Sequence, residues 1–269
     1  MRGIADYEFL RPIGAGGNGR VFLAGRPARL SGAADVVAVK VVGHESTSDT
    51  FRRGAARLRE YGVVRSPYLT ALYDVGQHDG IFYYGMEYLP GGSLAHPAQP
   101  VDAALQVRAV GDAARALAAL HLAGVVHGAV KPGNVLIDPY GAKLSDPDLR
   151  HVFVPGLRHS GRGGTDGLAF ADPAALLGEP PTPAHDMWSI GVLVHWVGTG
   201  SHGRDGLPVN DGLGALRQIL NTRLRLSPAQ ADPLRGIVYD CLAEAAHRPS
   251  ATEVADRIAA IAANMSTVP

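Results

Sequence analysis

The hydrophobic pattern of the chain changes at Pro90-Gly91-Gly92-Ser93, and this change limits the fold more than any other feature of the sequence. Before it, short apolar and β-branched runs alternate with turn residues, which is typical of strands. After it, apolar residues recur mainly at helical spacing. With 269 residues the chain can bury a sizeable core. The pattern predicts an α+β fold: a strand-rich N-terminal lobe with one helix, a glycine hinge and a mainly helical C-terminal lobe.

Five strands and one helix are expected before the break. Residues 36–42 are rich in β-branched side chains, which predicts a buried strand. Asn18-Gly19 predicts a tight turn, because both residues tolerate positive φ. The expected strands are 9–13, 20–24, 36–42, 69–76 and 81–89, with a turn at Gln77-His78-Asp79-Gly80 between the last two, and the expected helix is 51–61.

Helices dominate after the break. Residues 187–197 are apolar on nearly every side, which is typical of a helix at the centre of its lobe. Residues 149–183 have little periodicity and many glycines and prolines, so a long loop is expected. Ser250 followed by Glu253 predicts a capping box at the last helix. The expected helices are 103–123, 187–197, 233–243 and 252–263, with a short hairpin of 135–137 and 142–145.

The composition is that of a folded protein without a charge bias. Hydrophobic residues make up 46% of the chain, and 25 Lys and Arg balance 25 Asp and Glu. A net charge of zero argues against a general binder of nucleic acids or membrane surfaces, because both require a positive field. No apolar stretch approaches the roughly 20 residues that span a bilayer, and the single Cys241 has no intramolecular disulfide partner. We expect a protein partner, no nucleic-acid partner, no membrane insertion in this segment, and a cytoplasmic protein or cytoplasmic domain.

Two motifs in the strand-rich part are suited to phosphates. Ile13-Gly14-Ala15-Gly16-Gly17-Asn18-Gly19-Arg20-Val21 predicts a glycine hairpin whose backbone amides can approach phosphates closely, although such hairpins are common. Val37-Ala38-Val39-Lys40 ends an apolar strand with a lysine. Such a lysine is often a solvated edge residue, and only its place after a glycine loop suggests a phosphate ligand.

Four more motifs follow in the helical part, and together the six resemble the eukaryotic-like protein kinases, in particular the bacterial Ser/Thr kinase branch. His127-Gly128-Ala129-Val130-Lys131-Pro132-Gly133-Asn134 resembles the catalytic loop, and Asp146-Pro147-Asp148 stands where D-F-G belongs. Asp186-Met187-Trp188-Ser189-Ile190-Gly191 resembles the helix that anchors the catalytic loop, and His247-Arg248-Pro249-Ser250 the start of the last helix. The resemblance implies one kinase-like domain over 1–269, with an N-lobe of 1–86, a hinge of 87–93 and a C-lobe of 94–269.

The resemblance also implies ATP with Mg²⁺ and a set of binding residues. Lys40 would reach the phosphates, Met86 would be the gatekeeper, and Glu87-Tyr88-Leu89 would bond the base through the hinge backbone. The implied nucleotide-binding residues are Gly14, Gly16, Gly19, Val21, Ala38, Lys40, Met86, Glu87, Tyr88 and Leu136, and the implied metal ligands are Asn134 and Asp146. The alternative, that these residues persist as core and turn positions around an empty cleft, stays open on the sequence alone.

The position of the catalytic aspartate holds Ala129. Phosphoryl transfer needs a group that orients the hydroxyl and accepts its proton, and a positioned acceptor is worth roughly 10²–10⁴ in rate. Alanine supplies none, so no catalytic residue is assigned. Gly128 stands in place of the arginine that would bind a phosphorylated activation loop, so this switch is expected to be absent.

Other catalytic parts are altered too. Pro147 and Asp148 replace the phenylalanine and glycine of D-F-G, which leaves Asp146 as either a metal ligand or part of an Asp-Pro turn. The helix residue that should pair with the strand lysine is Gly54 in one alignment and Arg57 in another, and neither is acidic. Glu60 lies further along the same helix.

The A-P-E equivalent reads Asp172-Pro173-Ala174, so the glutamate that would form a buried pair with Arg248 is missing. A stranded buried charge costs several kcal/mol. We therefore predict a new acceptor for Arg248, with Asp172 as the obvious candidate.

These changes lead us to interpret the chain as a pseudokinase that acts in signalling by binding partner proteins. The alternatives are an ATP-dependent enzyme of unusual mechanism, with Asp146 or Asp148 as a surrogate base, and a weakly active Ser/Thr kinase. His127 is expected to be a core residue and Cys241 to be buried and inert. Ser160 and Thr165 are possible sites of phosphorylation by another kinase.

Overall fold

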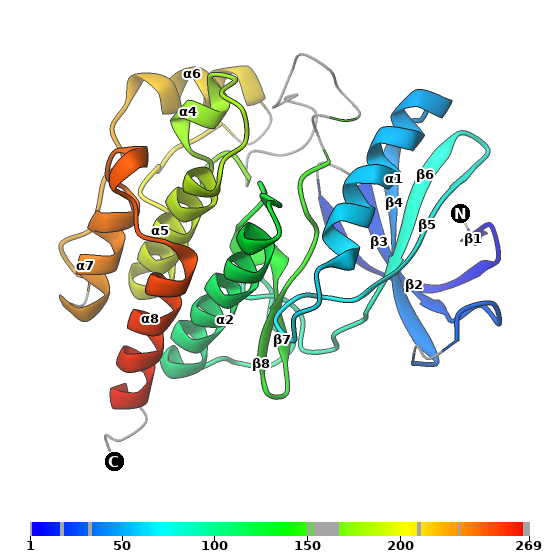
Figure 1. Cartoon of the computed structure of the whole chain (residues 1–269), viewed down its shortest axis with the longest axis horizontal. Helices are drawn as coiled ribbons and strands as arrows, with labels where there is room; N and C mark the ends of the chain where they lie inside the picture. Colours follow the sequence, from blue (N-terminus) through cyan, green and yellow to red (C-terminus); the bar gives the residue numbers. More distant parts are fainter. Residues whose placement is uncertain are drawn as a thin grey trace. The chain divides into compact units, whose positions relative to one another are not determined.

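The computed structural model describes residues 2–16, 19–31, 34–149, 152, 167–208, 211–230 and 232–265. These residues fall into two compact units, and each is described here by itself. The first contains the described residues up to Val63, then Thr70–Tyr88, and Leu149 with Val152. The second contains the other described residues, including Val64–Leu69. Figure 1 shows a sheet with one helix in the first unit and mainly helices in the second, which confirms the predicted α+β class.

The first unit is built on an antiparallel sheet in which β4 is an inner strand. Its order is β1-β2-β3-β4-β6-β5, and every neighbouring pair is antiparallel. The strands are β1 (Gly3–Ile4), β2 (Tyr7–Gly16), β3 (Gly19–Gly25), β4 (Val36–Glu45), β5 (Leu72–His78) and β6 (Ile81–Met86), and helix α1 (Ser48–Val63) joins β4 to β5.

Both faces of β4 are covered, because its side chains alternate between two apolar clusters. Val37, Val39 and Val41 belong to one buried cluster, together with Tyr7 of β2. The residues between them face the other cluster, which contains Leu58 of α1. The predicted buried strand is therefore confirmed, and a side chain on its α1-facing side is shielded from water.

Strands β2, β3 and β4 extend beyond the ranges expected from the sequence, whereas β5 begins later than expected, at Leu72, and β6 ends earlier, at Met86. The β5–β6 turn is tighter than expected, because His78 already pairs with Ile81. Asp79 and Gly80 have φ values of 48° and 74°, as the two central residues of a type I′ turn require. Helix α1 runs through Gly54 without a break.

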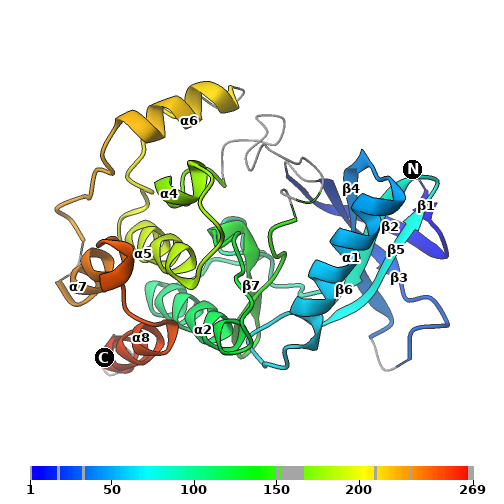
Figure 2. The same ribbon diagram turned by 45° about the horizontal axis from the view of Figure 1, so that its top comes forward.

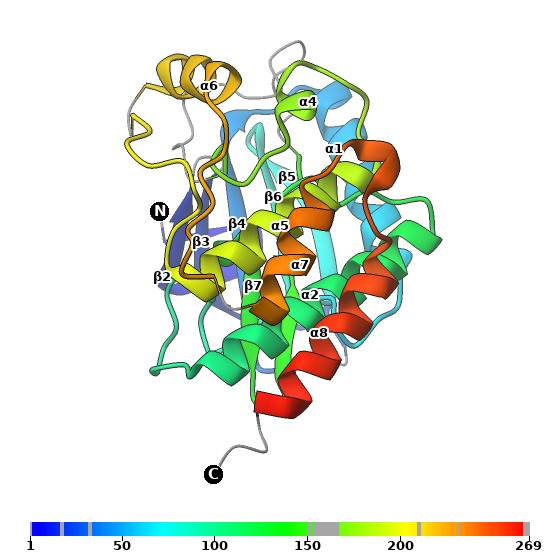
Figure 3. The ribbon, with the colours of Figure 1, turned by 90° about the vertical axis from the view of Figure 1, so that its left-hand side faces the viewer.

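The second unit is mainly helical and contains one short hairpin. Helices α2 and α8 lie side by side, and α5 is flanked by α2 and α7 (Figure 3). The elements are α2 (Ala103–Leu122), β7 (Val135–Asp138), β8 (Gly141–Leu144), α4 (Pro173–Leu176), α5 (Pro183–Thr199), α6 (Gly212–Asn221), α7 (Asp232–Cys241) and α8 (Ala251–Met265), with 3₁₀ turns at Pro132–Asn134 and Ala245–His247.

Helix α5 is the central helix of this unit, as its apolar sequence predicts. Ten of the eleven residues from His185 to His195 are buried, and the remaining one, Trp188, is half-buried. The helix ends at Gly200, whose φ of 75° is the left-handed conformation common after a last turn. Cys241 on the neighbouring α7 is fully buried, and burial raises the pKa of its thiol to about 12, as expected for an inert cysteine.

The predicted capping box opens α8. The backbone N–H of Ser250 donates to the carboxylate of Glu253 at 2.7 Å, and the N–H of Glu253 donates to the Ser250 hydroxyl at 3.2 Å. Two helices were not expected from the sequence, α4 and α6, which lie next to each other (Figure 2). The loop expected over 149–183 is described only in part: it includes α4, while Ser160 and Thr165 lie outside the described residues.

In the described part of the chain, none of the helices combines the length and the apolar character that crossing a membrane requires.

Candidate functional site

The glycine motif forms the hairpin between β2 and β3 in the first unit. Gly14 pairs with Val21, Ala15 with Arg20, and Gly16 with Gly19. Of the predicted turn Asn18-Gly19, residue 18 lies outside the described residues, as does residue 17. The pairing on both sides confirms a tight hairpin whose flanking residues are glycines.

Two glycines of this hairpin differ in what the fold demands of them. Gly19 has a φ of 137°, and a Cβ there would lie 2.0 Å from the carbonyl oxygen of Val41. A Cβ on Gly14 would lie 3.7 Å from the nearest side-chain atom, which is ordinary van der Waals distance. A glycine inside a strand is unfavourable unless something approaches its backbone closely. The fold therefore requires Gly19, whereas Gly14 leaves space for a group from outside the chain.

Alanine substitutions should separate these two roles. Gly19→Ala is expected to lower the free energy of unfolding by more than about 1–2 kcal/mol, because strained backbone and a backbone clash add together. Gly14→Ala should change the stability by less than about 1 kcal/mol, and in the favourable direction if β propensity dominates. Urea unfolding of both variants measures this, and equal losses would contradict the distinction.

Val21, Ala38, Lys40 and Met86 come together on the α1-facing side of the sheet. Ala38 pairs with Met86 across β4 and β6, and Lys40 pairs with Val21 on β3. Ala38 and Met86 are buried in the same apolar cluster, and Val21 packs against it. Lys40 follows Ala38 by two residues on this face and is only 7% exposed. The pairing of β4 with β3 and β6 therefore places on one face the side chains that are predicted to contact the base and the phosphates.

Two hydrogen bonds to Ala71 fix Glu87, the first residue of the predicted hinge. The backbone N–H of Glu87 donates to the carbonyl of Ala71 at 2.8 Å, and its carboxylate accepts from the N–H of Ala71 at 3.1 Å. Glu87 is therefore held against the residue before β5, and the contact between the backbone of Glu87-Tyr88-Leu89 and a base stays a prediction. The Tyr88 ring packs against the cluster around Met86, and its hydroxyl accepts a hydrogen bond from Arg11 at 3.2 Å.

Helix α1 presents no acid toward the sheet. Its buried residues are Gly54, Ala55, Leu58 and Tyr61. Gly54 lies one turn before Leu58, which packs in the cluster of Ala38 and Met86, so the sheet-facing candidate is the glycine. Glu60 is an exposed residue that accepts a hydrogen bond from Arg57 at 3.4 Å. Glu60 is therefore paired with Arg57 at the surface and is not among the buried residues of α1.

In the second unit, Asp186 at the start of α5 holds the loop that resembles a catalytic loop. The N–H groups of His127 and Gly128 donate to its two carboxylate oxygens at 2.8 and 2.7 Å. His121 at the end of α2 lies 2.9 Å from the same carboxylate. A buried carboxylate is stable only with such donors. The helix that was expected to anchor this loop does so through this residue.

Asn134 fixes the far end of the same loop. Its side-chain nitrogen donates to the carbonyl of Ala129 at 2.7 Å and to the carbonyl of Asp146 at 3.3 Å. These donations orient the amide so that its oxygen is the atom available to a cation. Ala129 is half-buried between the two anchors, Asp186 on one side and Asn134 on the other. The backbone of Ala129 is therefore fixed, and a longer side chain at this position would be placed without movement of the loop.

The D-F-G equivalent is tied to the loop through His127. The buried His127 ring lies 3.1 Å from the carbonyl of Ser145 through Nε2 and accepts from the N–H of Ala129 at 3.3 Å through Nδ1. It is a core residue, as predicted. Asp146 has a φ of 64°, an uncommon conformation for a non-glycine residue, and such outliers concentrate at functional sites. Leu136, the predicted base contact of this unit, lies half-buried on β7.

Gly128 and Asp148 share one space. Gly128 has a φ of 74°, and a Cβ there would lie 3.1 Å from the Cβ of Asp148. The N–H of Asp148 donates to the carbonyl of His127 at 2.9 Å, which holds the two segments together. The missing arginine and the added aspartate are therefore neighbouring changes.

The predicted pair of Arg248 and Asp172 is confirmed. A guanidinium nitrogen of Arg248 lies 2.5 Å from Asp172, and both side chains are nearly buried, at 6% and 3% exposed. Arg248 also donates to the carbonyls of Ala184 and Ala243, and its guanidinium lies over the Trp188 ring. Asp172 in turn caps α4 by accepting from the N–H of Ala174 at 3.0 Å. The carboxylate has moved two residues along the chain while the ion pair is retained.

Comparison with known proteins identifies this arrangement. A model of the protein kinase domain matches residues 7–256, which is most of the chain. The chain belongs to the protein kinase family. Among its relatives, a serine/threonine-protein kinase of Streptomyces coelicolor, PkaA, is 29% identical over 96% of this chain and 50% of its own length. PknJ of Mycobacterium tuberculosis is 30% identical over 83% of this chain and 38% of its own, and PrkC of Bacillus subtilis 25% identical over 88% and 37%. The kinase domain thus spans half or less of the length of these relatives.

One buried residue of this kinase domain was missed by sequence reasoning. Arg204, between α5 and α6, donates to the carbonyls of Leu168 and Ala171 at 2.8 and 3.1 Å. Burial lowers the pKa of its guanidinium to about 10, although nearby Asp172 raises it. Arg204 therefore fixes the segment before α4. A lone arginine in a glycine-rich loop carries no sequence signal for this role.

A metal site in this kinase domain would have few protein side chains as ligands. Within the described ranges, no group of three or more His, Cys, Asp and Glu side chains is placed to hold a metal ion. Mg²⁺ is typically held by one or two protein ligands together with water and phosphates, which is the arrangement that Asn134 and Asp146 fit.

Proposed function

We propose that this kinase domain binds ATP with Mg²⁺ and is an atypical, weakly active Ser/Thr kinase-type transferase. The observation that carries this proposal is the catalytic loop: Asp186 and Asn134 hold its backbone at both ends although the acceptor side chain at Ala129 is missing. The backbone arrangement of this loop is therefore present, and only the acceptor side chain is lacking. The relatives named as serine/threonine-protein kinases support the same reaction class.

The first unit would bind the base and the phosphates. Ala38, Met86 and Val21 supply an apolar wall, and Lys40 extends the same face with a positive charge. The space at Gly14 that a Cβ would fill fits a phosphate approaching the backbone. These features suit a triphosphate better than an apolar ligand.

The second unit would supply the metal ligands, Asn134 and Asp146. Bound Mg²⁺ neutralises charge on the phosphates during transfer. Ala129 offers no proton acceptor, and no acidic residue lies on the buried face of α1 to orient Lys40. We therefore expect transfer that is slower than that of a kinase with both groups, by roughly 10²–10⁴ for the acceptor alone.

A second candidate is a pseudokinase that binds partner proteins and transfers no phosphate. Ala129 is the observation that favours it, together with the altered pair of Gly128 and Asp148. It allows a cleft with or without ATP and differs from the first proposal on transfer, so the two separate in an activity assay.

Thermal unfolding with ATP, with and without Mg²⁺, tests nucleotide binding. A hundredfold excess of nucleotide over Kd is expected to stabilise the domain by about 2.7 kcal/mol. Lys40→Ala should abolish this stabilisation, because it removes the phosphate contact. Lys143→Ala, on β8 outside every motif, is the matched control and should keep it. If millimolar ATP leaves the wild-type transition unchanged, the proposal is wrong.

A radiolabel assay then separates the two candidates. Slow Mg²⁺-dependent transfer to protein that Asp146→Ala abolishes would support the transferase. Nucleotide-dependent stabilisation without transfer, over hours at millimolar ATP, would support the binding module instead.

A further inference from the structure

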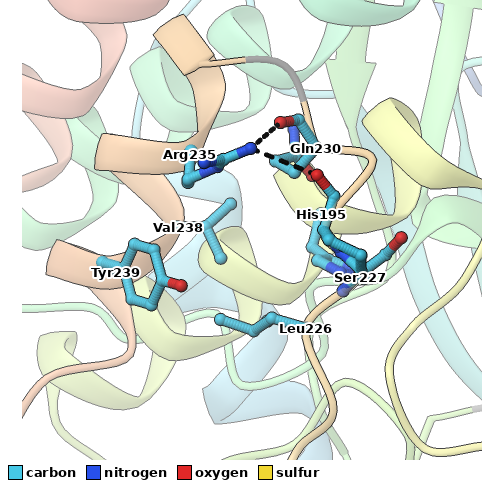
Figure 4. A pocket seen from close by; sticks show the side chains of 8 residues that line it. His195, Leu226, Ser227, Gln230, Arg235, Val238 and Tyr239 are labelled. Atoms are coloured by element: carbon cyan, nitrogen blue, oxygen red, sulfur yellow. Dashed lines mark hydrogen bonds between the residues drawn. The ribbon is translucent and has the colours of Figure 1, made fainter.

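The second unit contains a pocket that uses none of the kinase motifs. It lies between the C-terminal half of α5, the segment that precedes α7, and α7 itself, and its volume is about 210 Å³ (Figure 4). This is smaller than the roughly 300–1,000 Å³ that drug-sized ligands occupy. The pocket therefore suits a fragment-sized ligand. Its role does not follow from the proposed function, because none of its residues belongs to that site.

The walls of the pocket are held in place by hydrogen bonds. His195 on α5 lies 2.7 Å from the carbonyl of Ser201 through Nδ1 and accepts from the N–H of Ser227 at 2.8 Å through Nε2. Arg235 on α7 donates to the carbonyls of Pro228 and Gln230 at 3.1 and 3.0 Å. Figure 4 shows these bonds of Arg235 crossing the rim. The pocket is thus preformed by both helices.

The side chain of Gln230 is an exception to this hydrogen bonding in the pocket walls. It is only 3% exposed, yet neither its amide nitrogen nor its amide oxygen has a hydrogen-bond partner among the residues that the structure describes. A buried amide without partners bears the desolvation cost of both polar atoms. Buried groups of this kind are rare in folded proteins, and a bound water, an ion or a ligand group is the usual explanation.

The neighbouring helix makes room for this amide. A Cβ on Gly198 of α5 would lie 2.3 Å from the Gln230 side-chain nitrogen, so the amide rests directly on the helix backbone. Glycine inside a helix is less favourable than alanine. Two unfavourable choices, a helical glycine and an unpartnered amide, therefore occur at the same place. Local rules broken together in this way are typical of functional positions.

We propose that this pocket binds a compact ligand that carries a primary carboxamide on an apolar body. Gln230 turns from Gly198 into the pocket, its Nε2–H donates to the ligand carbonyl, and its Oε1 accepts from the ligand N–H. The apolar body lies against Leu226 and Val238. A carboxylate lacks the donor that Oε1 requires, and a ketone lacks it as well. The reciprocal pair of hydrogen bonds therefore selects the amide.

Benzamide tests this proposal, with acetophenone as an isostere without N–H donors and benzoate as an anionic analogue. Titration followed by NMR should give millimolar binding of benzamide, up to about tenfold tighter than acetophenone, because the one additional hydrogen bond, from the ligand N–H to Oε1, corresponds to at most roughly that factor. Gln230→Leu should abolish the preference while raising the melting temperature. Gln99→Leu, at an exposed position, should change neither. Gly198→Ala should retain the preference, because its Cβ pushes the amide toward the pocket.

Three results would overturn the proposal. Equal binding of benzamide and acetophenone would remove the amide from recognition, and tighter binding of benzoate would assign the pocket to an anion held by Arg235. If a crystal soaked with benzamide holds only ordered water at the Gln230 amide, water and not a ligand is the hydrogen-bond partner of this side chain. Each readout is independent of phosphate transfer, so the proposal stands or falls separately from the proposed function.

Discussion

Ala129→Asp is expected to raise the rate of phosphate transfer by about 10²–10⁴-fold, the usual worth of a positioned proton acceptor. The backbone at this position is already fixed, because Asn134 binds the carbonyl of Ala129 and Asp186 binds the N–H groups of the two preceding residues. The new carboxylate would therefore be positioned without rearrangement of the loop. Transfer from radiolabelled ATP measures the change, with Mg²⁺ present.

Ala129→Asn is the matched control, because asparagine has the size of aspartate but no basic oxygen. It should leave the rate within a few-fold of the wild type, and ATP-dependent stabilisation should be the same in all three proteins. If the aspartate and asparagine variants are equally slow, the missing acceptor does not limit the reaction. The absence of an acid opposite Lys40 on α1 would then be the dominant defect.

Arg248→Met is expected to lower the free energy of unfolding by about 3–5 kcal/mol, the usual cost of stranding one charge of a buried pair. The charge left behind is Asp172, whose side chain is only 3% exposed. The double variant Arg248→Met, Asp172→Asn should recover part of the loss, because it removes that charge and keeps a capping side chain before α4. Urea unfolding of the single and double variants measures the loss of stability and its partial recovery.

Arg257→Met provides the comparison for an exposed pair. Arg257 lies 2.7 Å from Asp240, but the two side chains are 39% and 51% exposed. Exposed pairs contribute about 0–1 kcal/mol, so this loss should be small. Equal losses at Arg248 and Arg257 would mean that burial of the Asp172 pair contributes nothing to stability.

The elements that could be predicted from the sequence are those with a clear hydrophobic pattern. The β-branched run of β4 and the apolar run of α5 were both located within a few residues. Helix α6 was missed because Gly212 and Gly214 in its first turn weaken the helical signal. The signal that was present is Asp211, whose side chain accepts from the N–H of Gly214 at 2.9 Å as an N-cap.

Contacts that follow from the charge of a buried residue could be predicted from the sequence. Contacts that depend on how distant segments meet in the fold could not. The family resemblance implied a buried Arg248, and the need of a buried arginine for an acceptor then identified Asp172. The N–H of Glu87 is bound to Ala71 because of how two strand ends meet, which no local pattern encodes. Arg204 was missed for a similar reason, since its burial arises from packing between segments that are distant in sequence.

The shared space of Gly128 and Asp148 has a consequence for the history of this domain. A larger residue at 128 meets both a left-handed backbone and the Cβ of Asp148, so a lone reversion toward arginine is unfavourable while the aspartate remains. Asp148 therefore opposes a larger side chain at position 128, whereas a glycine at 128 does not oppose a smaller residue at 148. An ordered change, in which position 148 becomes smaller first, is the easier way to regain an arginine at 128.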